Sequence, residues 1–115
     1  MRVFIDACVD PRVRELLPGH ETKTAFDMAW HRLKDHVLLS EIQDRFDVFV
    51  TADQGFEHEH NLGRLRFGLI IIHVKKNQIE FYRPLAAQLR KAIEQVRPGE
   101  VVHVPPQARA EEAPR

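Results

Sequence analysis

The chain has a single cysteine, Cys8, among its 115 residues, and it has no excess of charge of either sign. One thiol excludes an internal disulfide and is typical of proteins that work in a reducing compartment. Seventeen basic and seventeen acidic side chains cancel. There is therefore no overall field to attract nucleic acid or an anionic membrane, and any such contact would depend on a local patch.

Long apolar runs are also missing, since the longest, residues 67–72, is far too short to cross a bilayer. The first residues predict a strand and show no signal-peptide pattern, so we expect a cytoplasmic protein that does not engage a membrane. The length suits one domain, expected over residues 1–104. Residues 105–115 contain no core-forming side chains, and we expect them to form a disordered tail.

Apolar patterns predict strands that alternate with helices. The expected strands are residues 2–6, 20–24, 47–51, 69–74 and 100–104, and the expected helices are residues 11–17, 35–45 and 79–97, with one or two helical turns in 25–30 and a polar loop over 54–66. Such alternation predicts an α/β fold in which helices cover both faces of a mostly parallel sheet of about five strands, a three-layer α/β/α sandwich. We expect the strand order 2-1-3-4-5.

Two of the predicted strands lead into an aspartate, Asp6 after the first and Asp53 after the third. In an open parallel sheet, the carboxyl ends of the strands form the edge where ligands and metals bind. Neighbouring strands lie roughly 5 Å apart, so these two carboxylates could share one divalent cation. The structural alternatives are a turn residue for Asp6 and an Asx-turn ahead of Gly55 for Asp53. We favour the metal-site role for both.

Two further residues have two open interpretations each. Asp35 either caps the second long helix or adds a third acid to the same edge. Thr51 either holds a neighbouring carboxylate by a hydrogen bond or is simply a β-branched strand residue. Aspartates without a thiol or imidazole partner indicate Mg²⁺ or Mn²⁺, which can activate water for attack on a phosphodiester.

The seven histidines and the one cysteine are weaker indications of a functional site than the aspartates. The segment His58-Glu59-His60 contains two metal-binding side chains, but the sequence places no third ligand near them, so we interpret it as a solvated polar loop. Cys8 would need an adjacent base to act as a nucleophile. We interpret it as a small side chain that follows the first strand.

A series of motifs in a fixed order resembles the PIN-like family, small relatives of PIN-domain nucleases that include toxins of bacterial toxin–antitoxin systems. The motifs are FIDACV, LLPGHET, MAW with LKDHVLL, FDVFVTADQGFEHEHNL, LIIIHVKKNQIE, PLAAQL and RPGEVVHV, and together they cover residues 2–104. The resemblance implies a PIN-like α/β fold with an acidic metal-binding edge and ribonuclease activity on RNA. In toxin pairs, a small antitoxin protein blocks that edge. Oligomeric state is left open, with a homodimer as one alternative.

The resemblance also implies roles for individual residues. Asp6 and Asp53 match the family's acids after the first and third strands, and Asp35 matches an aspartate or asparagine before the second helix. Asn61 and Asn77 match positions that order loops.

Two departures from the family pattern weaken the acidic edge. Val37 stands where relatives commonly have a glutamate, and Gly55 stands where a second acid often follows the one after the third strand. Glu41 or Glu57 would have to compensate. The leading hypothesis is a Mg²⁺-dependent PIN-like ribonuclease, and the alternative is a weak or inactive PIN-like module that binds a protein or nucleic-acid partner.

Overall fold

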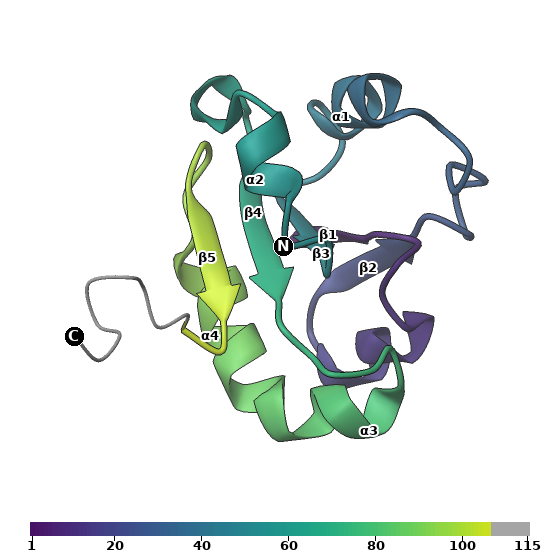
Figure 1. Ribbon diagram of the computed structural model, residues 1–115, viewed down its shortest axis with the longest axis vertical. Coiled ribbons are helices and arrows are strands. Elements are labelled where there is room, and N and C mark those ends of the chain that lie inside the picture. The colour runs from purple at the N-terminus through teal and green to yellow at the C-terminus, as the bar shows by residue number, and fades with distance from the viewer. Residues whose placement is uncertain (107–115) are drawn as a thin grey trace.

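A computed structural model describes residues 1–106 of the chain, so most of the predicted tail, residues 107–115, lies outside the part described. Its centre is a sheet of five parallel strands in the order β2-β1-β3-β4-β5 (Figure 1). The strands are β1 (Arg2–Ile5), β2 (Glu21–Thr24), β3 (Val48–Thr51), β4 (Gly68–Ile72) and β5 (Val101–Val104). The predicted strand order and the parallel pairing are confirmed. The order of the strands reverses between β1 and β3, which are neighbours.

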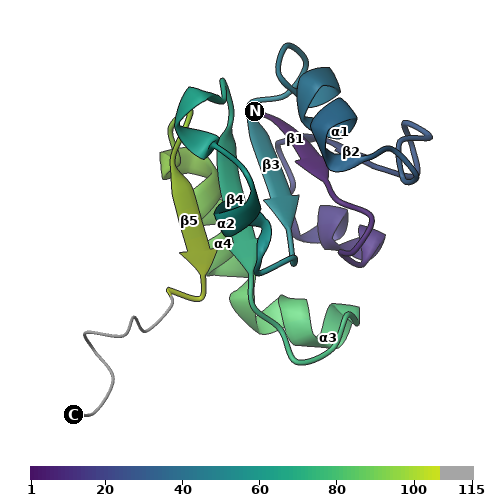
Figure 2. The same cartoon turned by 45° about the horizontal axis from the view of Figure 1, so that its top comes forward.

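Helices cover both faces of this sheet, which confirms the three-layer α/β/α arrangement. One face carries η1 (Pro11–Leu16), α3 (Ile79–Tyr82), η3 (Arg83–Leu85) and α4 (Ala86–Gln95), and the other carries α1 (Asp35–Ile42), α2 (Phe56–Glu59) and η2 (Leu62–Arg64). α4 crosses behind β4 and β5, and α2 passes in front of β4 (Figures 1 and 2).

The two cores differ in chemistry because strand side chains alternate between the faces. On β3, Val48 and Val50 point into a core made mainly of aliphatic residues under α4. Phe49 lies between them in sequence and points into the opposite core. The centroid of its ring lies 5.3 Å from that of Phe56 and 6.0 Å from that of Phe67. β3 is therefore buried on both sides, and its carboxyl end emerges in the middle of the molecule.

The prediction of a polar loop over residues 54–66 was wrong. This segment forms α2 and η2, because Phe56 and Leu62 are buried at 2% and 9% exposure and fix two short turns to the aromatic core. Polar residues outnumber these two anchors, which hides the helical pattern in the sequence.

Two predicted helices also differ. Residues 25–30 form turns rather than helix, and Ala29 has a positive φ of 59° that a helix does not allow. The single helix predicted over 79–97 is divided into α3, η3 and α4. Pro84 lies at the division, since its ring and missing N–H disrupt regular helical hydrogen bonding.

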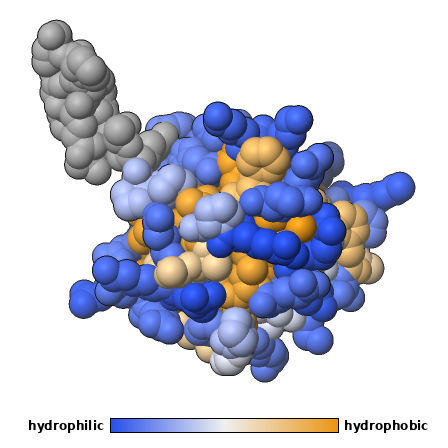
Figure 3. Space-filling view, turned by 90° about the horizontal axis from the view of Figure 1, so that it is seen from below, coloured by the Kyte–Doolittle hydropathy of each residue, from blue (hydrophilic) through white to orange (hydrophobic). Residues whose placement is uncertain are grey.

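Among residues 1–106, the large apolar side chains that are exposed are Met1, Phe26 and Val37. Seen from below, hydrophilic residues surround a smaller apolar area (Figure 3). Within residues 1–106, no helix has both the length and the apolar character needed to cross a membrane.

Candidate functional site

Asp6 directly follows β1, and its carboxylate is held by neighbouring groups. Oδ1 accepts a hydrogen bond from the Ala7 N–H at 2.8 Å, and Oδ2 accepts one from the Thr51 hydroxyl at 2.8 Å. Thr51 is fully buried at the end of the adjacent strand. The hydroxyl of Thr51 therefore fixes the orientation of the Asp6 carboxylate.

The same hydroxyl connects Asp6 to Asp53. Thr51 Oγ1 accepts a hydrogen bond from the Asp53 backbone N–H at 3.1 Å. Asp53 Oδ1 in turn accepts one from the Gly55 N–H at 3.0 Å, which is the Asx-turn geometry. Because Asp53 is exposed and only its Oδ1 is engaged within residues 1–106, the turn and a metal-binding role are compatible.

Cys8 lies against these groups, with its sulfur 3.4 Å from Asp6 Oδ2 and 3.3 Å from Thr51 Oγ1. Partial desolvation by the surrounding atoms raises the pKa of the Cys8 thiol, although the residue as a whole is exposed, and the negative charge of Asp6 raises it further. A nucleophilic cysteine needs a lowered pKa. The geometry therefore agrees with the non-nucleophilic interpretation of Cys8.

Asp35 does not cap α1. It is the first residue of that helix, Lys34 holds the cap position, and the cap has no side-chain hydrogen bond. Instead, Asp35 Oδ2 lies 3.2 Å from His60 Nε2. Of the two interpretations of Asp35, capping is wrong.

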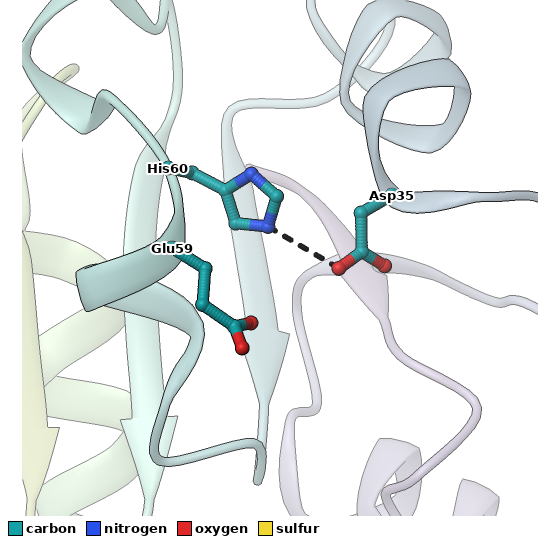
Figure 4. A group of neighbouring side chains, drawn as sticks. All are labelled: Asp35, Glu59 and His60. Atoms are coloured by element: carbon teal, nitrogen blue, oxygen red, sulfur yellow. Dashed lines mark hydrogen bonds and ion pairs between the residues drawn. The ribbon is translucent and has the colours of Figure 1, made fainter.

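Glu59 completes a group with Asp35 and His60. One ligand atom from each of the three side chains lies within 4.8 Å of the others, and no other such trio of His, Cys, Asp or Glu occurs within residues 1–106. Glu59 and His60 come from the end of α2 and Asp35 from the start of α1, and the three side chains converge in the space between these helices (Figure 4). Asp6 and Asp53 are not members of this trio.

Packing fixes the histidine of this group. The ring of His60 lies 4.4 Å from that of Phe56, which is buried in the aromatic core. The sequence did not place a third ligand near the His58-Glu59-His60 segment, because that ligand, Asp35, lies about 25 residues away in sequence on another helix. Only the tertiary fold brings them together.

Gly55 lies between the Asp53 carboxylate and this trio. A Cβ atom added at Gly55 would lie 3.6 Å from Asp53 Oδ1 and 3.9 Å from Glu59 Oε2. The two carboxylates therefore flank one small space. The carboxylate of Glu59 therefore lies near Gly55, where the family resemblance implies an acid, and the sequence did not single out Glu59 as a ligand.

The two acids suggested as compensating residues have other partners. Glu57 Oε1 lies 2.7 Å from His103 Nε2, and Glu41 pairs with Arg45 at 3.5 Å one turn along the same segment. Val37, where the family resemblance implies a glutamate, is 37% exposed on α1. None of these three side chains belongs to the group around Asp35.

The two asparagines differ in what they contact. Asn77 Oδ1 accepts hydrogen bonds from the Asp10 N–H at 2.7 Å and from the Tyr82 hydroxyl at 2.6 Å, so it orders the loop between β4 and α3. Asn61 is exposed at the start of η2, and its side chain makes no capping hydrogen bond there.

The donor atoms indicate which cations fit. Asp6 and Asp53 offer carboxylate oxygens alone, which suit Mg²⁺ or Mn²⁺ because these ions need few protein ligands and retain water. The Asp35, Glu59 and His60 group adds an imidazole nitrogen to two carboxylates. Imidazole is a poor ligand for Mg²⁺ but an accepted one for transition metals. Taken together, the Asp6 and Asp53 pair and the Asp35, Glu59 and His60 group therefore fit Mn²⁺ better than Mg²⁺.

Comparisons of the chain with protein-family models, with curated proteins and with solved structures found no match. The fold is established by the structure, whereas the PIN-like resemblance rests on the sequence motifs and stays a prediction.

Proposed function

We propose that this protein is a metal-dependent PIN-like ribonuclease in which Asp6 and Asp53 hold Mg²⁺ or Mn²⁺ and Asp35 assists. One observation carries the proposal: Asp6 and Asp53 emerge from adjacent parallel strands where the strand order reverses, and Thr51 hydrogen-bonds to both. This is the position at which open α/β sheets bind their ligands.

The residues of the edge would have separate tasks. Thr51 and the Ala7 N–H hold the Asp6 carboxylate in one orientation, and the Gly55 N–H does the same for Asp53. A divalent cation bound there supplies charge stabilisation for a phosphoryl group and lowers the pKa of water. Asp6 and Asp53 therefore provide binding and orientation.

Glu59 connects the Asp6 and Asp53 pair to the group formed by Asp35 and His60. It shares the space at Gly55 with Asp53 and belongs to the group with Asp35 and His60. We assign Asp35 and Glu59 to the binding of a cation whose ligands include nitrogen, which favours Mn²⁺ as the activating ion.

The proposal is tested by the cleavage of single-stranded RNA by the full chain with Mn²⁺ or Mg²⁺. Asp53→Asn keeps the shape of the side chain and removes its charge, so we expect cleavage to fall at least tenfold. Glu94→Gln removes an exposed charge from α4, on the opposite layer, and serves as the matched control.

Two results would contradict the proposal. Asp53→Asn could cut RNA as fast as the parent chain, or cleavage by the parent could persist when a chelator removes divalent ions. Either result would assign the cleavage to another site or to a contaminating nuclease.

The wider role proposed here is that of a cytoplasmic toxin. The lone Cys8 is typical of a reducing compartment. A small antitoxin protein would block the acidic edge, and the genetic neighbourhood tests this idea directly. A gene for a small DNA-binding protein beside this one supports the toxin role, and the absence of any small neighbouring gene argues against it.

A non-catalytic module is the second candidate. It is favoured by Val37, which exposes an apolar side chain where relatives carry an acid, and by Gly55, which leaves a second acid out. Calorimetry with Mn²⁺ separates the candidates, because a module without a metal site gives no heat that Asp6→Asn removes.

A further inference from the structure

Two histidines that the proposed nuclease site does not use face each other across neighbouring strands. His73 directly follows β4 and His103 lies on β5, whose register pairs Ile71 with His103. His73 Nε2 and His103 Nδ1 are 2.7 Å apart, and the ring centroids are 5.0 Å apart. Both residues are partly buried. The pair is therefore fixed by the sheet rather than by flexible surface side chains.

Glu57 determines which nitrogen of His103 carries a proton. Its Oε1 lies 2.7 Å from His103 Nε2, and the His103 and Glu57 side chains are only 18% and 24% exposed. An anionic oxygen at this distance repels a ring lone pair and attracts a ring proton, so the contact favours the proton on Nε2 of His103. Nδ1 of neutral His103 then presents its lone pair toward His73.

His73 can present a second lone pair in the same place. Nδ1 of His73 has no hydrogen-bond partner among residues 1–106. Every buried side-chain nitrogen in that range does have a partner, so Nδ1 of His73 is not buried and is accessible to solvent. The ring proton can therefore move to Nδ1 and be hydrated there, which leaves Nε2 free. Burial lowers the pKa of His73, and the neighbouring His103 lowers it further, so the ring is neutral near pH 7.

We infer that His73 and His103 are the protein ligands of a second cation site, one for a divalent ion of the zinc, nickel and copper class, and that Glu57 orients His103 for this role. Metal-binding histidines typically have a carboxylate beside their other ring nitrogen, and Glu57 Oε1 lies 2.7 Å from the other ring nitrogen of His103. Imidazole nitrogen is a preferred ligand of these ions and not of Mg²⁺. The inference does not depend on the nuclease proposal.

Metal binding requires the two rings to separate and to turn. Zn–N bonds of about 2.0–2.1 Å in a tetrahedral site place two nitrogens about 3.3 Å apart. The 2.7 Å between His73 Nε2 and His103 Nδ1 must therefore widen by about 0.6 Å. Because the ring centroids are only 5.0 Å apart, the rings point at each other, and each must also turn so that both lone pairs meet at the ion. β5 is an edge strand that pairs on one side only, so it can move this far without breaking a second ladder. Water would complete the coordination.

The test is a Zn²⁺ titration of full-length Asp35→Asn, a variant that removes one ligand from the other nitrogen-containing group. Nitrogen-detected NMR of the imidazole rings follows His73 Nε2 and His103 Nδ1. We expect both resonances to shift with Zn²⁺ and to reach a plateau at one equivalent. The site is ruled out if Zn²⁺ leaves both resonances unchanged and only pH moves them, because the pair would then bind a proton alone.

Calorimetry with Zn²⁺ on the same background gives an independent reading. His73→Gln should abolish the binding, and Glu57→Gln should weaken it by about tenfold to a hundredfold. His31→Gln changes an exposed histidine elsewhere and should have no effect. Equal losses in His73→Gln and His31→Gln would overturn the inference, because they would indicate nonspecific binding. If His73→Gln fails to fold, the NMR titration decides.

Discussion

Thr51 is the residue on which the proposed site depends most. It is fully buried, it donates to Asp6, and it accepts from the backbone of Asp53. One hydroxyl thus sets the positions of two acids on different strands. In the sequence, Thr51 could equally be an ordinary β-branched strand residue, and only the atomic contacts separate the two interpretations.

The alkylation rate of Cys8 depends on the charge of Asp6. Because partial desolvation and the Asp6 charge raise the pKa of the thiol, we expect the exposed Cys8 to react with iodoacetamide at pH 8 more slowly than cysteine in a short peptide. Asp6→Asn removes the charge and lowers the pKa, so more thiolate is present and alkylation should accelerate. Mass spectrometry of timed samples measures both rates. Equal rates for the parent and Asp6→Asn would show that the contact between these side chains is absent in solution.

Gly55 offers a gain-of-function test at the same scale. Its φ of −85° suits any residue, and an added Cβ would make ordinary contacts with Asp53 and Glu59. Gly55→Asp should therefore introduce a further carboxylate and tighten Mn²⁺ binding, measured by calorimetry. Gly55→Asn is the matched control, since it adds the same bulk without charge. Equal affinities for the two variants would show that no cation binds beside Gly55.

Among the elements, α2 determines how the acidic edge is completed. It separates Asp53 from Glu59 by one short helical turn, and its buried Phe56 holds His60 in place. The continuous apolar runs of β1, β3 and β4 are long enough to predict from sequence. A four-residue helix with one apolar anchor is not, which is why Glu59 and His60 were interpreted as loop residues.

Gly68 on β4 packs closely against the side chain of Val96, the residue that follows α4. A Cβ at Gly68 would lie 2.6 Å and 2.7 Å from the two methyl carbons of Val96. Gly68→Ala should thus lower the free energy of unfolding by about 1–3 kcal/mol through overpacking, measured by urea denaturation. In a Val96→Ala background the two methyl groups are gone, and the cost of Gly68→Ala should largely disappear. The same cost in both backgrounds would contradict this packing.

At the scale of the whole molecule, regular alternation of strands and helices made the fold predictable. The parallel pairing follows from this alternation, and the strand order, which brings Asp6 and Asp53 to adjacent strands, is one of the common orders of such sheets. The grouping of Asp35 with Glu59 and His60, and of His73 with His103 and Glu57, depends on side chains far apart in sequence. No local spacing encodes such contacts.

The central claim is that the edge formed by Asp6, Asp53 and the Asp35 group binds a divalent cation. Paramagnetic Mn²⁺ broadens the amide NMR signals of residues near it, so a Mn²⁺ titration of the full chain locates the ion directly. We predict that the signals of Asp6, Asp53, Gly55 and Glu59 broaden first, and that Asp53→Asn weakens this effect. Broadening that begins elsewhere, or that is the same in Asp53→Asn, would contradict the account.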